Sequence, residues 1–182
     1  QWIDSATLFP SNMALAATSN TDFAFEQGLI TSLEARAIGV NIALSPVLDI
    51  NNNPENPIIN FRSYSDHPDI VSKFGISFIK GVQKNKVFSC IKHFPGHGNT
   101  SVDSHTNLPL IPGSKEDLFK NELKPFKDAI DSGVKMVMMG HIAMPGLDSA
   151  NIPASQSKKI TTDLLRTDWN FDGLIITDGM EM

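Results

Sequence analysis

Ionisable side chains are concentrated in one segment of the chain, KHFPGHGNTSVDSH, residues 92–105. Because Pro95, Gly96 and Gly98 interrupt both helical and strand periodicity, this segment is predicted to be an irregular loop. It follows an apolar run, residues 87–91, that is typical of a buried strand. In α/β enzymes, catalytic residues commonly lie on loops that follow buried strands. The loop is therefore the first candidate for an active site.

Asp103 and His105 form an Asp-x-His pair within this loop. If the backbone is extended there, both side chains point in the same direction, and the carboxylate can hydrogen-bond the imidazole. Such a contact orients the ring and raises its basicity, which suits a group that donates and accepts a proton near neutral pH. The alternative is a turn in which Asp103 only caps the backbone.

Asp178 follows the apolar residues 174–177. A carboxylate at the carboxyl end of a buried strand lies at the mouth of an α/β site, where it can act as a nucleophile or stabilise a positive charge. The same position also suits an aspartate that caps the next helix. The position leaves both roles open.

Three further side chains offer hydrogen-bond donors to a substrate. Lys92 and His93 end the apolar run before the loop, and Arg62 lies in the segment NFRSYSDHP. The alternative for Arg62 is a solvated or salt-bridged loop residue.

A metal site is the competing interpretation of the same loop. His93 and His97, with Asp103 and His105, are residue types that ligate metals. However, the proline and glycine between the first two histidines keep them off a common helical face, and the chain has no H-E-x-x-H pattern. We therefore expect no metal.

The elements that must position these residues alternate along the chain. Four apolar runs that end in polar residues are predicted strands: residues 42–48 before Asp49, 87–91 before Lys92, 134–140 before His141, and 174–177 before Asp178. Helical patterns cover residues 21–38, the segment that Asp66 to Pro68 open, residues 114–133, and residues 163–169.

This alternation predicts an α/β fold with parallel strands, and the continuous apolar runs indicate a sheet that is covered on both faces. A doubly wound sheet and a (β/α)8 TIM-type barrel both fit. The barrel is favoured because all four strand ends carry polar residues that can converge on one face. Four strands cannot close a barrel, the chain starts at Gln1, and it ends soon after the last run. We therefore expect it to be part of a longer protein.

The composition excludes several functions. The chain has 182 residues, of which 41% are hydrophobic, as in a globular domain. Its net charge of -5 argues against a nucleic-acid or anionic-membrane binder. No apolar run approaches the roughly 20 residues that cross a bilayer. The single cysteine, Cys90, lies in an apolar run and is expected to be a small core residue rather than a nucleophile.

The motif K-H-F-P-G-H-G, followed after four residues by D-S-H, resembles the signature of family 3 glycoside hydrolases, in their β-N-acetylglucosaminidase branch. The segments FPSNMALAAT, SPVLDI, NFRSYSDHP and LIITDGMEM are also similar to that family. The resemblance implies a partial (β/α)8 barrel. Residues 1–182 would form the central part of a single N-terminal catalytic barrel that is truncated at both ends.

The resemblance also implies roles for individual residues. Asp178 matches the catalytic nucleophile, His105 the general acid/base, and Asp103 the partner of that histidine. The remaining matches are substrate-binding residues: Arg62, Lys92 and His93, which would hold the sugar, and Asp49 and His141, which would support them.

The implied activity is retaining hydrolysis of terminal β-linked N-acetylglucosamine from peptidoglycan or chitin-type fragments, as in peptidoglycan recycling, through a covalent glycosyl-enzyme. No cofactor is implied, the partner is a carbohydrate, and the acceptor is water or phosphate. A β-glucosidase of the same family and a non-catalytic sugar-binding relative are the alternatives. Family members occur in the cytoplasm and outside it, and the full-length chain can carry an additional domain.

Overall fold

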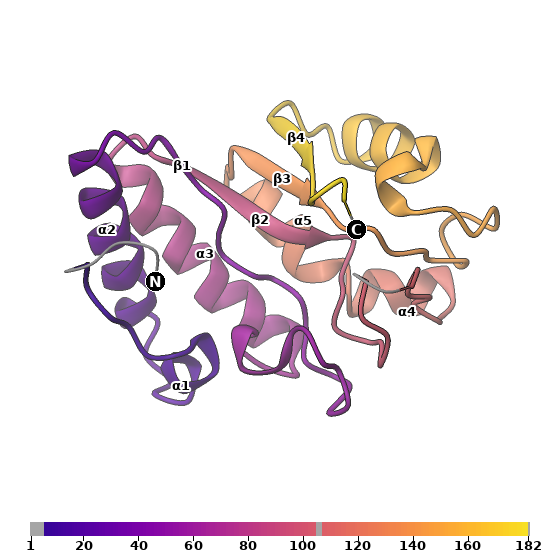
Figure 1. Cartoon of the computed structure of the whole chain (residues 1–182), viewed down its shortest axis with the longest axis horizontal. Helices are drawn as coiled ribbons and strands as arrows, with labels where there is room; N and C mark the ends of the chain where they lie inside the picture. The colour runs from indigo at the N-terminus through magenta and orange to yellow at the C-terminus, as the bar shows by residue number, and fades with distance from the viewer. Residues whose placement is uncertain (1–5, 105–106, 182) are drawn as a thin grey trace.

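The structure is a computed structural model and describes residues 6–104 and 107–181. Four strands form one parallel sheet whose order follows the chain: β1 (Ile42–Ala43), β2 (Phe88–Phe94), β3 (Met136–Met139) and β4 (Leu174–Thr177). Because all pairs are parallel, the carboxyl ends of the strands lie along one edge of the sheet (Figure 1). The predicted α/β fold with parallel strands is confirmed.

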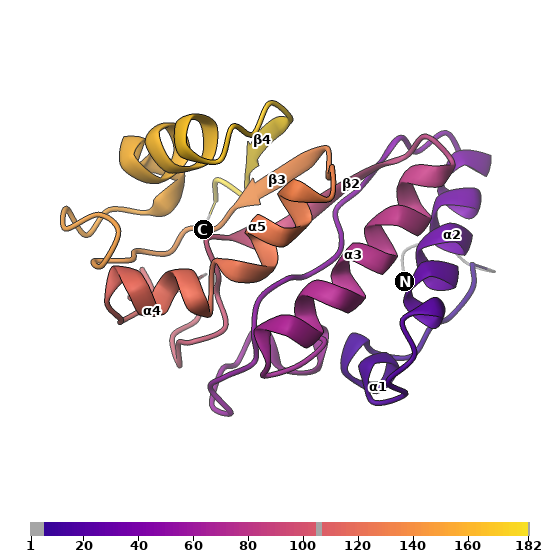
Figure 2. The same ribbon diagram turned by 180° about the vertical axis from the view of Figure 1, so that it is seen from behind.

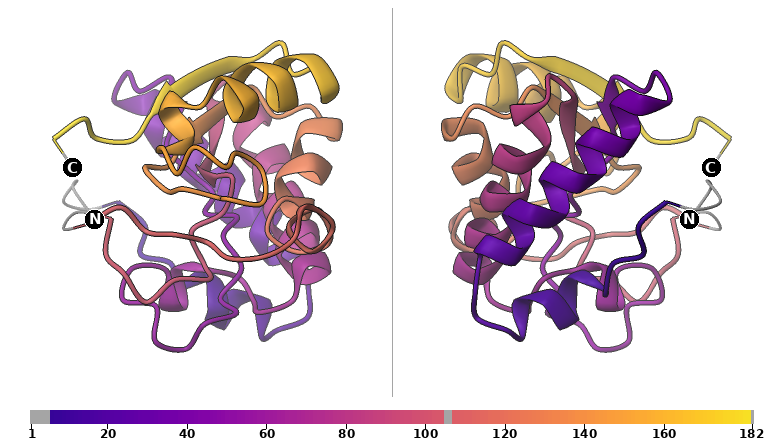
Figure 3. Two further views of the ribbon diagram at one scale, coloured as in Figure 1. Left: turned by 90° about the vertical axis from the view of Figure 1, so that its right-hand side faces the viewer. Right: turned by 90° about the vertical axis from the view of Figure 1, so that its left-hand side faces the viewer.

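Helices connect the strands, as the sequence pattern predicts. They are α1 (Asn12–Ala16), α2 (Asp22–Ala37), α3 (Pro68–Lys84), α4 (Lys115–Lys120), α5 (Lys124–Asp131) and a π-helix, η3 (Lys159–Asp168), with short 3-10 turns η1 (Asn60–Arg62) and η2 (Ala154–Gln156). The helices α3 and α5 lie behind the sheet in Figure 1 and in front of it in Figure 2. In the side views of Figure 3, the segment after β4 projects away from this helical layer. None of the described helices combines the length and apolar character that a membrane span needs.

The strands differ from the predicted ones at their ends. Regular pairing in β1 stops at Ala43 because the run continues into Pro46, which has no N–H to donate. The chain nevertheless stays beside β2: the N–H of Leu48 donates to the carbonyl oxygen of Lys92 at 2.8 Å. At its other end β2 extends to Phe94, so Lys92 and His93 lie within the strand rather than at the start of a loop.

The predicted helix over residues 114–133 is two helices in the structure. Ser114 caps α4 as predicted, since its Oγ accepts the N–H of Asp117 at 3.2 Å. The helix then ends at Lys120, and Pro125 stands in the first turn of α5. Proline lacks an N–H and favours the start of a helix, which explains why a second helix begins there.

The core lies between the sheet and the helices and is anchored by aromatic rings. The Phe94 ring meets Phe126 edge-on, with the ring centroids 5.4 Å apart, and meets Trp169 at 5.6 Å. Phe94 directly follows His93, so this packing holds the end of β2 in place from the core side.

Candidate active site

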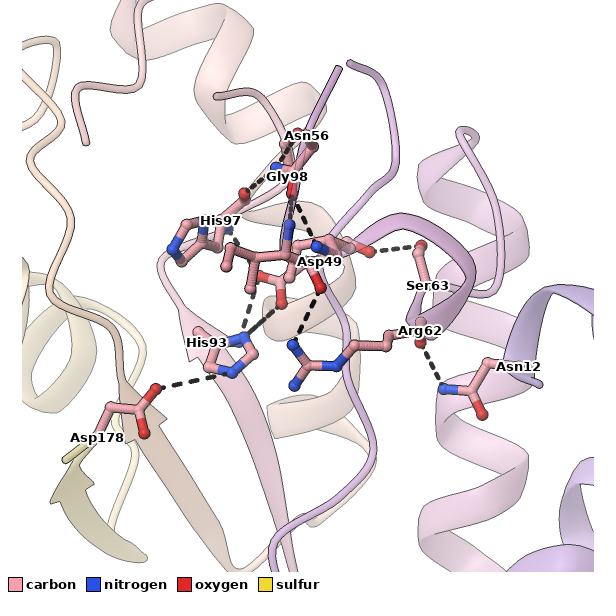
Figure 4. A network of polar contacts seen from close by, with 11 residues as sticks. Asn12, Asp49, Asn56, Arg62, Ser63, His93, His97, Gly98 and Asp178 are labelled. Carbon is pink, nitrogen blue, oxygen red and sulfur yellow. Dashed lines mark hydrogen bonds and ion pairs between the residues drawn. The ribbon is translucent and has the colours of Figure 1, made fainter. Parts of the chain in front are cut away.

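Three strand ends bring their side chains together around the ring of His93 (Figure 4). His93 is the penultimate residue of β2, Asp49 follows the run after β1, and Asp178 follows β4. The Nδ1 atom of His93 lies 2.7 Å from Oδ2 of Asp49, and its Nε2 atom lies 3.7 Å from Oδ2 of Asp178. The imidazole therefore stands between two carboxylates.

The carboxylate of Asp49 is completely buried and accepts further hydrogen bonds from the backbone of the loop. The N–H of His93 lies 3.2 Å from each of its oxygens, and the N–H of His97 donates to Oδ1 at 2.7 Å. Burial alone would raise the pKa of Asp49, but the charge and hydrogen bond of His93 and the contacts with His97 hold this pKa below its ordinary value. Asp49 is thus an ionised anchor beneath the loop.

Asn56 holds the next part of the same loop. Its Nδ2 donates to the carbonyl oxygens of His97 at 2.8 Å and Gly98 at 2.9 Å, while its Oδ1 accepts the N–H of Ile59 at 2.7 Å. A Cβ on Gly98 would lie 1.6 Å from the carbonyl oxygen of Ile50, so only glycine fits. Sequence reasoning did not identify Asn56, because these contacts join residues about 40 positions apart in the chain.

His97 is buried beside His93, and the two rings meet edge-on with centroids 6.0 Å apart. Neither ring nitrogen of His97 has a hydrogen-bond partner within the described ranges. Burial is the main cause that lowers the pKa of His97. The ring is therefore held in its neutral form, which disfavours a role as a cation.

Lys92 and Arg62 bring two positive charges to the site. Burial lowers the pKa of Lys92, and the neighbouring Arg62 lowers it further, whereas the charges of Asp178 and Asp49 act in the opposite direction. Both cations line a cavity of about 400 Å³ together with Phe61. They are placed to bind hydroxyl or anionic oxygens that enter it.

Asp178 differs from Asp49 in its exposure. Its side chain is 31% exposed, whereas that of Asp49 is 0% exposed. Its backbone N–H donates to the carbonyl oxygen of Met139 at 2.9 Å, which continues the pairing of β3 and β4, and its Oδ1 accepts the N–H of Gly179 at 3.0 Å. One carboxylate oxygen is thus tied to the backbone while the other faces His93.

His141 contacts the protein through both ring nitrogens. Nε2 lies 3.0 Å from the carbonyl oxygen of Gly179 and Nδ1 lies 2.9 Å from Oγ of Ser155. Because a carbonyl only accepts, Nε2 carries a proton and donates to Gly179, and Nδ1 forms a hydrogen bond with the Ser155 hydroxyl. His141 therefore holds the segment that follows Asp178.

The predicted Asp-x-His pair is only partly described. Asp103 is half-buried, and its carbonyl oxygen accepts the N–H of Asn107 at 3.2 Å. His105 lies outside the described residues, so its contact with Asp103 stays a prediction. Among residues 6–104 and 107–181, no three His, Cys, Asp or Glu side chains are arranged to hold a metal ion.

Comparisons with known proteins cover the whole chain. Residues 1–182 match the family model described as the glycosyl hydrolase family 3 N terminal domain. The chain is 35% identical to a beta-hexosaminidase A of Pseudoalteromonas piscicida over 98% of its own length and 32% of the relative. It is 34% identical to a beta-N-acetylglucosaminidase/beta-glucosidase of Cellulomonas fimi, over 100% of this chain and 34% of that relative. The chain therefore spans about a third of these relatives.

A solved structure shows the same fold. The glycoside hydrolase family 3 beta-N-acetylglucosaminidase of Paenibacillus sp. str. FPU-7 superposes with a TM-score of 0.97 and is 41% identical, over 99% of this chain and 34% of that one. The predicted fold class, a partial (β/α)8 barrel, is confirmed.

Proposed function

This chain belongs to the glycosyl hydrolase family 3 N-terminal domain family, and from that premise we propose that its protein is a retaining β-N-acetylglucosaminidase. The substrate would be a terminal β-linked N-acetylglucosamine of peptidoglycan or chitin-type fragments. The observation that carries the proposal is the partly exposed carboxylate of Asp178, which directly follows β4, beside His93 and within the electrostatic reach of Lys92. Relatives that are named for hexosaminidase activity support the substrate class.

In this proposal Asp178 attacks the anomeric carbon and forms a glycosyl-enzyme, which water then hydrolyses. The charges of Lys92 and Asp178 interact across the site, so the cation lies where it can also attract the oxygens of a bound sugar. Arg62 and Lys92 would bind sugar hydroxyls from the cavity that both line.

The acid and base of the reaction would be His105, with Asp103 as its partner. Retaining glycosidases commonly pair two carboxylates about 5 to 5.5 Å apart. Asp49 is unsuited to be the second carboxylate, because it is completely buried and its oxygens accept from His93 and His97. That burial supports a different acid/base, the role that the resemblance assigns to His105.

The test is to trap the glycosyl-enzyme in the full-length protein. We expect 5-fluoro-N-acetylglucosaminyl fluoride to inactivate the enzyme and to add one sugar to Asp178. Fluorine at C5 slows both steps, but the fluoride leaving group at C1 keeps the first step fast, so the glycosyl-enzyme accumulates. Peptide mapping by mass spectrometry locates the label. Asp178→Asn is the control and should stay unlabelled; a label on another side chain would remove Asp178 from the nucleophile role.

A β-glucosidase is the second candidate, since the Cellulomonas fimi relative carries both activities in its name. Aryl N-acetylglucosaminide and aryl glucoside assayed side by side separate the two. We expect kcat/KM to be higher for the N-acetylglucosaminide, and a preference for the glucoside would replace the proposed substrate.

A further inference from the structure

Asp49 has no exposed surface, so it does not touch a substrate, yet its carboxylate contacts both the ring and the backbone of His93. A completely buried carboxylate is costly unless several donors satisfy it. Here the donors are the two backbone N–H groups of His93 and His97 and the ring of His93. One carboxylate therefore sets the path of the loop and the orientation of the ring.

The hydrogen bond to the ring also determines where its proton sits. An ionised carboxylate can only accept, so the Nδ1 atom of His93, 2.7 Å from Asp49, carries a hydrogen. In the neutral ring the Nε2 atom is then unprotonated. Nε2 lies on the side of Asp178, 3.7 Å from its Oδ2. An unprotonated imidazole nitrogen accepts a hydrogen bond, and a sugar hydroxyl can donate one.

We propose that Asp49 is a positioning residue that holds His93 as the Nδ1–H tautomer, so that Nε2 accepts a hydrogen bond from a substrate hydroxyl beside Asp178. The identity of that hydroxyl as part of a sugar rests on the proposed function. The tautomer itself follows from the contacts of Asp49 and does not depend on the reaction.

The test uses the full-length protein and the variant Asp49→Asn. Asparagine keeps the shape and an oxygen for the N–H of His97, but its NH2 group faces Nδ1 of His93 as a donor. His93 should then move its proton to Nε2. Long-range proton–nitrogen NMR spectra of histidine-labelled protein distinguish the two tautomers, and the loss of a signal in His93→Gln assigns it. The spectra are recorded at a series of increasing pH values, because the two tautomers are distinguished in the neutral His93 ring.

We expect the wild type to show Nδ1–H and Asp49→Asn to show Nε2–H. The kcat/KM of the variant should fall on the order of 100-fold, as expected for a misplaced or wrongly protonated group. Its melting temperature should stay close to that of the wild type. If Asp49 were only structural, stability and kcat/KM would fall together.

Asp148→Asn is the matched control. Its carboxylate also accepts several hydrogen bonds, from Ser157 Oγ at 2.7 Å and from the N–H of Ala150 at 3.1 Å, but it takes no part in the His93 cluster. We expect wild-type kcat/KM and an unchanged His93 spectrum.

Two results would overturn the proposal. One is an Nε2–H tautomer in the wild type, a measurement that holds even if Asp49→Asn does not fold. The other is wild-type kcat/KM in a folded Asp49→Asn whose tautomer has changed. If the wild type cleaves no glycoside, the proposed function fails, but the tautomer is still tested by the spectrum.

Discussion

The two carboxylates on either side of the His93 imidazole differ in their exposure to solvent. The side chain of Asp49 has no exposed surface and accepts several hydrogen bonds, whereas nearly a third of the Asp178 side chain is exposed. A carboxylate without solvent access can only orient its neighbours, while an exposed one can meet a reacting carbon. The difference in burial, rather than residue type, therefore separates the positioning aspartate from the proposed nucleophile.

Burial also determines the reactivity of Cys90, which lies two residues before Lys92. Its side chain has no exposed surface, and burial is the main cause that raises the pKa of the thiol to about 12. The nucleophilic thiolate is then scarce at neutral pH, in agreement with the core role expected from the sequence. We expect a disulfide reagent to modify Cys90 at least about 100-fold more slowly in the native than in the denatured protein.

The rate of thiol release after mixing with the reagent, with and without denaturant, measures this effect. Cys90→Ala identifies the signal, because the missing thiol belongs to Cys90. Rapid modification of the native protein at pH 7 would contradict the burial of this side chain.

At the scale of elements, α2 packs tightly against α3, which in turn contacts β2. The helices α2 and α3 approach until their backbones touch. A Cβ on Gly28 would lie 2.3 Å from the carbonyl oxygen of Phe78, and a Cβ on Gly81 would lie 2.2 Å from that of Phe25. Each helix therefore needs a glycine where it crosses the other.

Gly81→Ala should separate α2 from α3 and destabilise the full-length protein. Alanine favours a helix by about 1 kcal/mol over glycine. We expect the clash to outweigh this gain and to leave a net loss of about 1–3 kcal/mol in the free energy of unfolding. Urea denaturation measures this difference.

Lys80→Ala is the control on the same helix, since Lys80 is exposed and its truncation should change stability by less than about 0.5 kcal/mol. Equal stabilities of the two variants would show that the helices are not in backbone contact at Gly81.

At the scale of the whole molecule, the described sheet has two open sides. Within residues 6–104 and 107–181, β1 pairs only with β2 and β4 only with β3. The apolar side chains of Ile42 and Leu174 on these strands are 40% and 51% exposed. Unpaired apolar strands favour association with other chains. We infer that further strands of the barrel cover these edges in the whole protein.

The 182-residue chain expressed alone should therefore be inactive and poorly stable. We expect no detectable turnover of an aryl N-acetylglucosaminide, together with broad, non-cooperative thermal unfolding monitored by circular dichroism. The full-length protein is the reference in both measurements. Full turnover with a cooperative transition in the isolated chain would contradict this prediction.

Local patterns in the sequence are enough to predict much of this protein. The four apolar runs become four parallel strands, and the motif of residues 92–105 agrees with the family that the comparisons show. Local chemistry also explains the deviations, because prolines end the regular part of β1 and start α5. Strand and helix preferences act over a few residues, so they can be read from neighbours in the chain.

The contacts of the site do not follow from local patterns. Asp49 is 44 residues from His93, and Asn56 is 41 residues from His97. Their hydrogen bonds form only because parallel pairing brings the ends of separate strands to one edge of the sheet. The resemblance gives Asp49 a supporting role in binding the sugar, and packing buries its carboxylate beneath the loop, where it contacts His93. Burial and orientation arise from all elements together, so only the folded chain shows that Asp49 is buried against His93 while the side chain of Asp178 stays 31% exposed.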